Sequence, residues 1–443
     1  MPSSDTPDRG APESSTTSPR TSLWRNPDFL KIWTAQSTSN LGRMMMVVPL
    51  VAILILEARP YQMAIIGGAT TAAGLMFGLI AGPWIDRSKR RIVLVITDFG
   101  SAAALGSVAI AHFLFELHIQ HLYAVAFING SMGIFNEVAQ RSYLPSLVDR
   151  DKLLEANSKM AASDAVVEQI GFSVGGFIAQ LASAIAASVV QTATFLISGL
   201  IVLAIRKPEP VPPKPDQRPN IRREILDGYR YIGRNQTLRL ITISGILLGA
   251  ASGIIGGMIT LFAISEIGFQ PGPLGIIYGI GGLSSFVGAL FVARVTNRLG
   301  VGPTMAVGLF SYGVVGFLIP FAPTQIWIAT IFFVLPQIFG DGLWVMHDIN
   351  KTSLQQAIIP ENYLGRVIGA MKVSENMAAL IGVSIAGVVA EIVGLRIALG
   401  MGSVIWIVAG AIYLHPTIRS IRTIPGSETV DTTHPKSENP STD

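Results

Sequence analysis

Long apolar runs alternate with short polar stretches along most of the chain. Each run reaches or approaches the roughly 20 residues that an α-helix needs to cross a bilayer. We therefore predict an all-α membrane protein with twelve transmembrane helices, at 29–56, 62–84, 92–115, 121–139, 156–181, 183–205, 238–263, 273–293, 303–321, 325–349, 365–390 and 396–415. The first run is longer than one crossing requires, and Trp24, Phe29 and Trp33 stand where aromatic residues anchor a helix at the membrane surface.

Composition supports a membrane protein and excludes an ordinary soluble enzyme. Only 14% of the 443 residues are charged, 50% are hydrophobic, and the mean hydropathy is +0.51, whereas soluble proteins average about 25% charged residues. The chain has no cysteine, which excludes disulfides, thiolate metal sites and a cysteine nucleophile. We predict no cofactor and no metal site.

The basic residues indicate the orientation of the spans. With the N-terminus inside, 28 of the 32 Lys and Arg residues fall in inside segments, Arg59 and Arg396 fall outside, and Arg43 and Lys372 lie within spans. This asymmetry follows the positive-inside rule and predicts both termini in the cytoplasm of a bacterium, with the chain in its inner membrane. Basic loops beside anionic lipid also explain the net charge of +4 without a nucleic-acid partner.

A polar linker divides the chain into two halves. Residues 206–237 begin with a proline-rich stretch and continue as a basic amphipathic segment from Ile221 to Tyr231, which predicts a linker with an interfacial helix. We predict five regions: a disordered cytoplasmic tail at 1–28, a six-helix half at 29–205, the cytoplasmic linker at 206–237, a second six-helix half at 238–415, and a disordered cytoplasmic tail at 416–443.

The two halves resemble each other at a constant offset of 211 residues. Gly42 lies opposite Gly253, Asp164 lies opposite Glu375, and the glycine-rich segment starting at Gly171 lies opposite the segment starting at Gly382. Duplicated six-helix halves place a substrate site near the bilayer midplane, between the halves. The repeat predicts a transporter in which one half rocks against the other.

The loop after the second span carries a motif. The segment from Gly82 to Arg91 contains a glycine, an aspartate–arginine pair and a basic run, and in this it resembles the signature loop of the major facilitator superfamily. The resemblance covers nearly the whole chain and implies that Gly82, Asp86, Arg87 and Arg90 gate the transporter, by pairing with a neighbouring helix end in one conformation only. The alternative is a basic loop that only sets topology.

Further segments are similar to the branch of this superfamily that holds enterobactin exporters and macrolide efflux proteins. They are residues 39–42, 143–148, 154–157, 356–361 and 365–367. The resemblance implies export. Residues 171–176 also resemble the antiporter motif of drug–proton exchangers, with Phe172 where that motif has proline. The alternative for this glycine row is small-residue helix packing.

Charges inside the spans are candidates for function, because ionisable groups are costly in lipid. The resemblance implies that the first, fourth, seventh and tenth spans line the cavity, so that Arg43 would face it, with possible partners Glu137, Asp341, His347 and Asp348. The alternative is an Arg43 paired only for structure. We predict Arg43, Asp164, Glu168 and Asp341 as substrate-binding or proton-coupling residues.

Helical spacing supports this choice of acids. Asp164 and Glu168 are four residues apart and project from one helix face, where two close carboxylates suit proton coupling. Two other pairs, Asp348 with Lys351 and Lys372 with Glu375, are predicted to neutralise each other at i, i+3 spacing.

The function predicted from the sequence is secondary export of a small, amphipathic, drug-like compound by proton antiport, with alternating access in a monomer. The partners are the substrate, protons and lipid. One alternative is export of an anionic siderophore, for which Arg43 would be the counter-charge; another is a non-transporting membrane sensor. The chain has no phosphate-binding loop, no Gly-x-Ser-x-Gly elbow and no His-Glu-x-x-His segment, so we predict neither an ATP-driven pump nor an enzyme.

Overall fold

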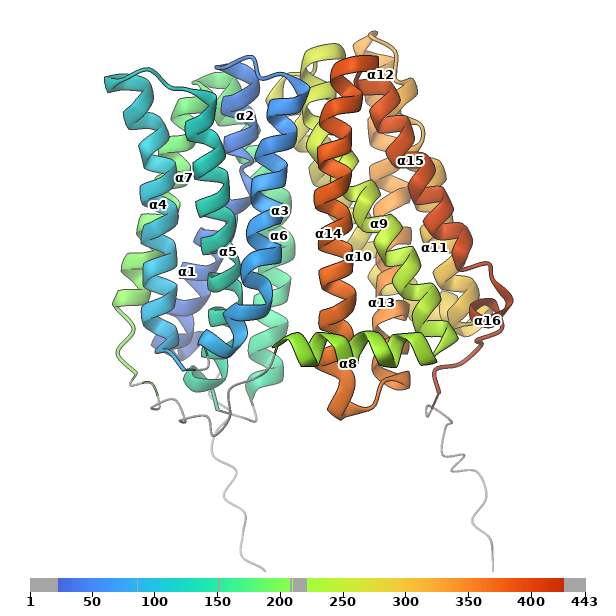
Figure 1. The fold of residues 1–443 in the computed structure, drawn as a ribbon. Helices are drawn as coiled ribbons and strands as arrows, with labels where there is room; N and C mark the ends of the chain where they lie inside the picture. Colours follow the sequence, from blue (N-terminus) through green and yellow to red (C-terminus); the bar gives the residue numbers. More distant parts are fainter. Residues whose placement is uncertain (1–22, 86, 150–151, 208, 210–220, 426–443) are drawn as a thin grey trace, which may run out of the picture.

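The protein is a bundle of long, roughly parallel helices, seen in a computed structural model (Figure 1). The structure describes residues 23–85, 87–149, 152–207, 209 and 221–425, and these contain no strand. The first half comprises α1 (Pro27–Met44), α2 (Val47–Leu54), α3 (Pro60–Ile85), α4 (Arg90–Leu114), α5 (Ile119–Leu147), α6 (Leu153–Leu181) and α7 (Ala184–Leu203). Within it α1 and α2 together make one crossing segment.

The second half repeats this arrangement. It comprises α9 (Gln236–Leu261) continued by η3 (Phe262–Glu266), α10 (Pro271–Leu299), α11 (Val301–Gly316) with η4 (Ile319–Phe321), α12 (Ile326–Leu335) continued by η5 (Pro336–Gly340) and α13 (Asp341–Ile358), α14 (Glu361–Val393) and α15 (Leu395–Ile412). The described chain thus has twelve crossing segments, as predicted, and the all-α class is confirmed.

Within the described residues, length and hydropathy alone find ten helices that could cross a membrane. The two that it leaves out are α5 and α6, whose inner faces carry Asn136, Glu137, Asn157, Asp164 and Glu168. These polar residues line a cavity, which is the setting in which a membrane helix tolerates them. α5 also continues through Pro145 to Leu147, beyond the predicted end of the fourth span at 139.

Glycine contacts show the predicted repeat in three dimensions. A β-carbon at Gly171 of α6 would lie 3.2 Å from the carbonyl oxygen of Leu41 in α1, and a β-carbon at Gly382 of α14 would lie 3.0 Å from Cα of Ala250 in α9. The two glycines are 211 residues apart and pack against corresponding helices. The same close approach therefore holds α1 against α6 and α9 against α14.

The linker contains α8 (Ile221–Arg234), which lies across one end of the bundle (Figure 1). We call this end the α8 face. Gly228 of α8 packs on the backbone of Arg366, and Asp227 pairs with Arg366 at 3.9 Å. Helix α8 is therefore fixed to the start of α14.

The predicted tails are wrong at their inner ends. The structure has a 3-10 turn, η1 (Leu23–Arg25), and a short helix, α16 (Pro416–Arg419), because Leu23 and Ile418 are both buried. The outer parts, 1–22 and 426–443, lie outside the described residues.

The two halves meet along two helix pairs, α6 with α10 and α3 with α14. Far from the α8 face the pairs are tight: β-carbons at Gly275 and Gly387 would lie 2.8 Å from Cα of Ser173 and 3.2 Å from Cα of Tyr61. Toward the α8 face, β-carbons at Gly78 and Gly82 would meet no heavy atom of the described chain within 4 Å. The halves are closed at the opposite face and separate toward the α8 face.

Candidate functional site

A cavity of about 800 Å³ lies in the half of the bundle nearer the α8 face. We call it the central cavity. Its walls come from α1, α3, α5 and α6, and its charged and amide side chains are Asn40, Arg43, Asn129, Asn136, Glu137, Gln140, Arg141, Asn157, Asp164 and Glu168. Three of the four predicted site residues, Arg43, Asp164 and Glu168, therefore share one cavity.

Arg43 projects from the last turn of α1. Its Nη2 donates to Ser39 Oγ at 3.1 Å, and its guanidinium lies 5.7 Å from the centroid of the Phe195 ring. The absent side chain of Gly133 makes room for it, because a β-carbon there would lie 3.2 Å from Arg43 Nη1. Within the described residues no carboxylate oxygen lies within the 4.0 Å of an ion pair with Arg43.

The acid behind Arg43 is Asp98 of α4, a residue that the site prediction did not include. Asp98 is 2% exposed and accepts hydrogen bonds from Ser39 Oγ at 3.1 Å, Asn136 Nδ2 at 3.0 Å and Ser198 Oγ at 2.6 Å. Ser39 thus bridges Arg43 to Asp98. This network joins α1, α4, α5 and α7. Through Ser39 it holds the guanidinium of Arg43 in place on the cavity wall.

Asp164 and Glu168 face the central cavity from α6, as their spacing predicts. Asp164 Oδ1 accepts from Asn40 Nδ2 of α1 at 2.7 Å and is half-buried. Glu168, one turn further from the α8 face, is exposed to the cavity. The two acids differ in environment, with one held by an amide and the other facing open space.

Asp341 does not line the central cavity. It begins α13 and packs against Gly281 of α10, beside Gln337. On the other side of that helix pair, the residue that follows Glu168 along α6, Gln169, packs on Gly282 of α10, next to Gly281. Asp341 therefore lies across the α6–α10 interface from Glu168, in the other half of the molecule.

The predicted partners of Arg43 on the tenth span are not its neighbours. His347 is fully buried within the second half, where its Nδ1 lies 2.9 Å from the carbonyl oxygen of Met305. Asp348 pairs with Lys351 at 2.9 Å and Lys372 with Glu375 at 3.8 Å, which confirms both predicted i, i+3 pairs. Glu137 does line the cavity, but it pairs with Arg141 at 2.8 Å.

The predicted gating residues run from the last turn of α3, where Gly82 lies, to Arg90, the first residue of α4. Asp86 lies outside the described residues, Arg87 is exposed, and Gly82 faces open space. Arg90 pairs with Glu209 of the linker at 3.3 Å, and the backbone N–H groups of Arg90 and Arg91 donate to the same carboxylate at 2.8 and 3.2 Å.

Glu209 therefore caps the N-terminus of α4, where an anion is favoured by the helix dipole. In this conformation the basic run therefore has two partners, Glu209 of the linker and the end of α7, where Arg91 Nε donates to the carbonyl oxygen of Val202 at 3.2 Å. The sequence shows Glu209 only as one residue of a proline-rich stretch, so its role could not be predicted from spacing.

The described residues hold no group of three or more His, Asp or Glu side chains arranged for a metal ion. What the site offers is a large polar cavity in the half of the bundle nearer the α8 face, with two arginines and three carboxylates on its walls. A bundle of twelve crossing segments with such a cavity defines a membrane transporter of the duplicated six-helix class.

Comparison with known proteins identifies the family. The model of the Major Facilitator Superfamily matches residues 32–382, so the chain belongs to this superfamily of transporters and is not an enzyme. This confirms the resemblance drawn from the motifs.

Relatives with assigned names include efflux proteins at low identity. The chain is 22% identical over 411 residues to the uncharacterized MFS-type transporter YfiS of Bacillus subtilis, covering 88% of this chain and 94% of the relative. It is 23% identical to the multidrug efflux pump Tap of Mycolicibacterium fortuitum (75% and 81% covered) and 24% identical to macrolide efflux protein A of Streptococcus pyogenes (72% and 78% covered).

Solved structures show the same fold. A bacterial homologue of the iron transporter ferroportin in an inward-facing state matches with a TM-score of 0.68 at 16% identity, covering 89% of this chain and 99% of that one. The nucleoside transporter NupG matches with a TM-score of 0.67 at 15% identity, covering 87% and 98%.

Proposed function

We propose that this transporter exports small amphipathic organic compounds by exchange for protons. The observation that carries the proposal is the central cavity, in which Arg43 and the acids Asp164 and Glu168 share walls with Met44, Ile134 and Met160. Apolar surface with a few convergent polar groups is typical of small-molecule sites. The similarity of the chain to Tap and to macrolide efflux protein A supports export of drug-like molecules.

The α8 face is proposed to be cytoplasmic, with both chain ends on that side and the chain in a cell membrane. The positive-inside rule supports this orientation. The conformation is then inward-open, with closure at the outer face. Arg59 and Glu391 lie 3.9 Å apart there and join the two halves, and Gln180 Oε1 of α6 accepts from the N–H of Gly272 in α10 at 3.1 Å.

Protons are proposed to act on the pair of acids that the α6–α10 interface separates. Glu168 faces the cavity and Asp341 lies across the interface. Two like charges held in proximity disfavour double ionisation, so proton binding at Glu168 would ease the approach of the two halves. Alternating access then follows from rocking at this interface, within a single chain acting as a monomer.

The test is transport by the full chain in proteoliposomes with an imposed pH gradient. The substrates are a radiolabelled macrolide and the fluorescent acid 8-anilinonaphthalene-1-sulfonate. We expect accumulation of one or both against their gradient and its loss in Glu168→Gln, with passive exchange of the same substrate retained. Glu155→Gln is the matched control, because Glu155 lies on the same helix, pairs with Lys159 at 3.4 Å and does not line the central cavity. Accumulation that is unchanged in Glu168→Gln would exclude this proton route, and an absence of flux for every compound would favour a sensor.

A second candidate function is export of an anionic siderophore. The observation that favours it is the lack of an ion-pair partner for Arg43 within the described chain. Secretion of catechol iron chelators by a deletion strain, compared with its parent, tests it. Equal secretion by the two strains would exclude this candidate.

A further inference from the structure

A second, smaller chamber lies beyond Arg43, on the side away from the α8 face. It has a volume of about 360 Å³, which is within the range of small-molecule sites. We call it the inner chamber. It shares Arg43, Thr70, Asn129 and Gly130 with the central cavity, and helix α9 of the second half contributes Gly256, Gly257 and Thr260. Arg43 therefore stands between the two spaces.

The first crossing segment breaks at this chamber. Helix α1 ends at Met44, and Met46 adopts a left-handed conformation with φ 51° and ψ 33° before α2 begins at Val47. A left-handed residue with a side chain is strained, and no side chain of the described chain caps the start of α2. The first N–H groups of α2 have no partner within their helix, and their residues, Val47 and Val48, line the chamber.

Gln191 of α7 supplies an independent polar group on the same wall. It is 3% exposed, and its Nε2 donates to the carbonyl oxygen of Gly42 at 2.7 Å. That bond fixes the amide and leaves Oε1 buried without a hydrogen-bond partner among the described residues. Asn129 Oδ1 is likewise buried and unpartnered, and both residues line the chamber. Each oxygen therefore keeps an unused acceptor position at the chamber wall.

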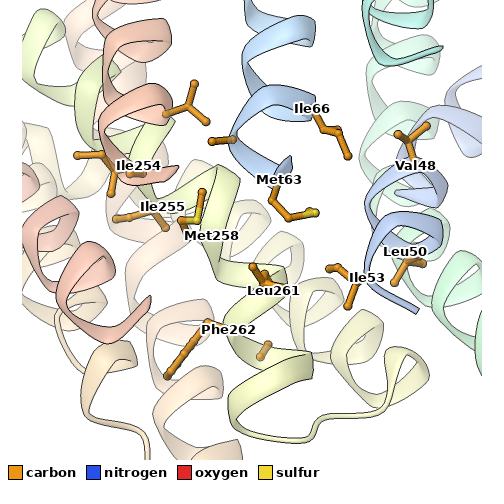
Figure 2. Packing of buried hydrophobic residues seen from close by; sticks show 14 of the residues in the cluster. Val48, Leu50, Ile53, Met63, Ile66, Ile254, Ile255, Met258, Leu261 and Phe262 are labelled. Carbon is orange, nitrogen blue, oxygen red and sulfur yellow. The ribbon is translucent and has the colours of Figure 1, made fainter. Parts of the chain in front are cut away.

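The rest of the wall is apolar. Met63 and Ile66 project from α3 toward α2, where Val48 faces them (Figure 2). The same figure shows Leu261 of α9 and Ile53 of α2 packed further toward the opposite face, where they belong to the buried core. The chamber therefore combines a polar end at Arg43 with a closed apolar end.

We propose that the inner chamber binds amphipathic organic anions: the acidic group lies between the Arg43 guanidinium and the N-terminus of α2, a hydroxyl or N–H group of the ligand donates to Gln191 Oε1, and the apolar body fills the space beside Met63 and Ile66. This names the substrate class of the proposed exporter and rests on that function. A helix N-terminus and a guanidinium both favour an anion. The chamber suits an acid better than the central cavity does, since Arg43 is the one charged residue among the described residues that line it.

The natural absence of cysteine allows a direct test of charge selectivity. A single cysteine replaces Thr71, which lines the inner chamber only, or Ala161, which lines the central cavity only. Each full-length variant is treated with an anionic (sulfonatoethyl) and a cationic (trimethylammonioethyl) methanethiosulfonate. We divide the labelling rate of the anionic reagent by that of the cationic reagent and compare this ratio with the ratio for a free thiol in solution. Both reagents react with the same thiolate, so its ionised fraction cancels.

We expect Thr71→Cys to prefer the anionic reagent by about tenfold, because the positive charge of Arg43 lines the same chamber without an ion-pair partner among the described residues. Arg43→Gln should bring that ratio close to one, Arg43→Lys should keep most of it, and Arg294→Gln, an exposed residue of α10, should leave it unchanged. Ala161→Cys should show no anion preference. Three outcomes would overturn the proposal: a cation preference at Thr71→Cys, a labelling ratio that Arg43→Gln leaves unchanged, or no labelling of Thr71→Cys by either reagent.

Competition tests the ligand class. We expect 3-hydroxybenzoate to slow labelling of Thr71→Cys more than benzoate does, and 3-hydroxybenzamide to have little effect. Equal slowing by the two acids would overturn the role of Gln191, and no slowing up to the solubility limit would overturn the assignment of an organic anion. Labelling does not require transport, so a correct charge ratio without proton-driven flux would leave this site standing and refute the proposed exporter.

Discussion

Arg43 carries a positive charge near the middle of a membrane protein. Its guanidinium contacts the hydroxyl of Ser39 and the ring of Phe195, and forms no ion pair with a carboxylate of the described chain. An arginine at the centre of a membrane helix costs about 2.5–3.5 kcal/mol on insertion scales. A structural arginine would recover this cost through an ion pair. Arg43 is instead presented to two connected spaces, and Asp98 supports it only through Ser39.

Asp98 is therefore predicted to be a structural residue that positions Arg43. Asp98→Asn leaves the donors of Ser39, Asn136 and Ser198 facing an amide, and we expect a loss of about 1–3 kcal/mol in the free energy of unfolding. Thermal unfolding in detergent measures it. Asp348→Asn is the matched control, because that carboxylate is 47% exposed, and we expect little change. Equal melting temperatures for Asp98→Asn and wild type would contradict this role.

At the scale of elements, the sequence predicts the helices better than the features within them. The apolar runs predict all twelve crossing segments, including α5 and α6, whose polar residues keep them out of the ten spans that hydropathy finds within the described residues. The break at Met46 was not predicted, because Met44, Met45 and Met46 continue an apolar helical pattern without glycine. Such a break depends on contacts made by the folded chain, here the close approach of Gly175 to Met45.

The candidate site, too, could be predicted from the sequence only in part. Asp164 and Glu168 could be placed in one cavity because helical spacing fixes their common face. The network behind Arg43 could not be predicted, because Asp98 and Ser198 come from helices distant in sequence and neither carries a motif. Similarly, Glu209 meets Arg90 only after the linker folds back.

The repeated glycine contacts make a prediction for helix packing. At Gly382 a new β-carbon would lie 2.9 Å from the carbonyl carbon of Ala250, whereas at Gly400 it would meet nothing within 4 Å. We expect Gly382→Ala to force α9 and α14 apart and cost about 1–3 kcal/mol. Gly400→Ala should be neutral or slightly stabilising, because alanine favours a helix. Equal melting temperatures for the two variants would show that this contact is not tight.

For the whole molecule, the closure at the face opposite α8 predicts that one state can be trapped. A β-carbon at Gly67 would lie 3.3 Å from Val383 Cγ2, so cysteines at these two positions are within reach of each other. In the chain without other cysteines, oxidation of Gly67→Cys with Val383→Cys should link α3 to α14 and stop transport, and reduction should restore it. Gly78→Cys with Val383→Cys should not crosslink. Full transport after complete crosslinking would contradict rocking at this interface.

In the proposed transport cycle, Arg43 selects the acidic group of an exported amphipathic anion. The most direct measurement is uptake of 8-anilinonaphthalene-1-sulfonate into proteoliposomes under an imposed pH gradient, compared between wild type, Arg43→Gln and Arg43→Lys. We predict proton-driven accumulation by wild type, a loss of about tenfold or more in Arg43→Gln, as removal of a charged hydrogen bond gives, and substantial recovery in Arg43→Lys. Accumulation by Arg43→Gln at the wild-type rate, with this variant as stable as the wild type, would contradict this role of Arg43.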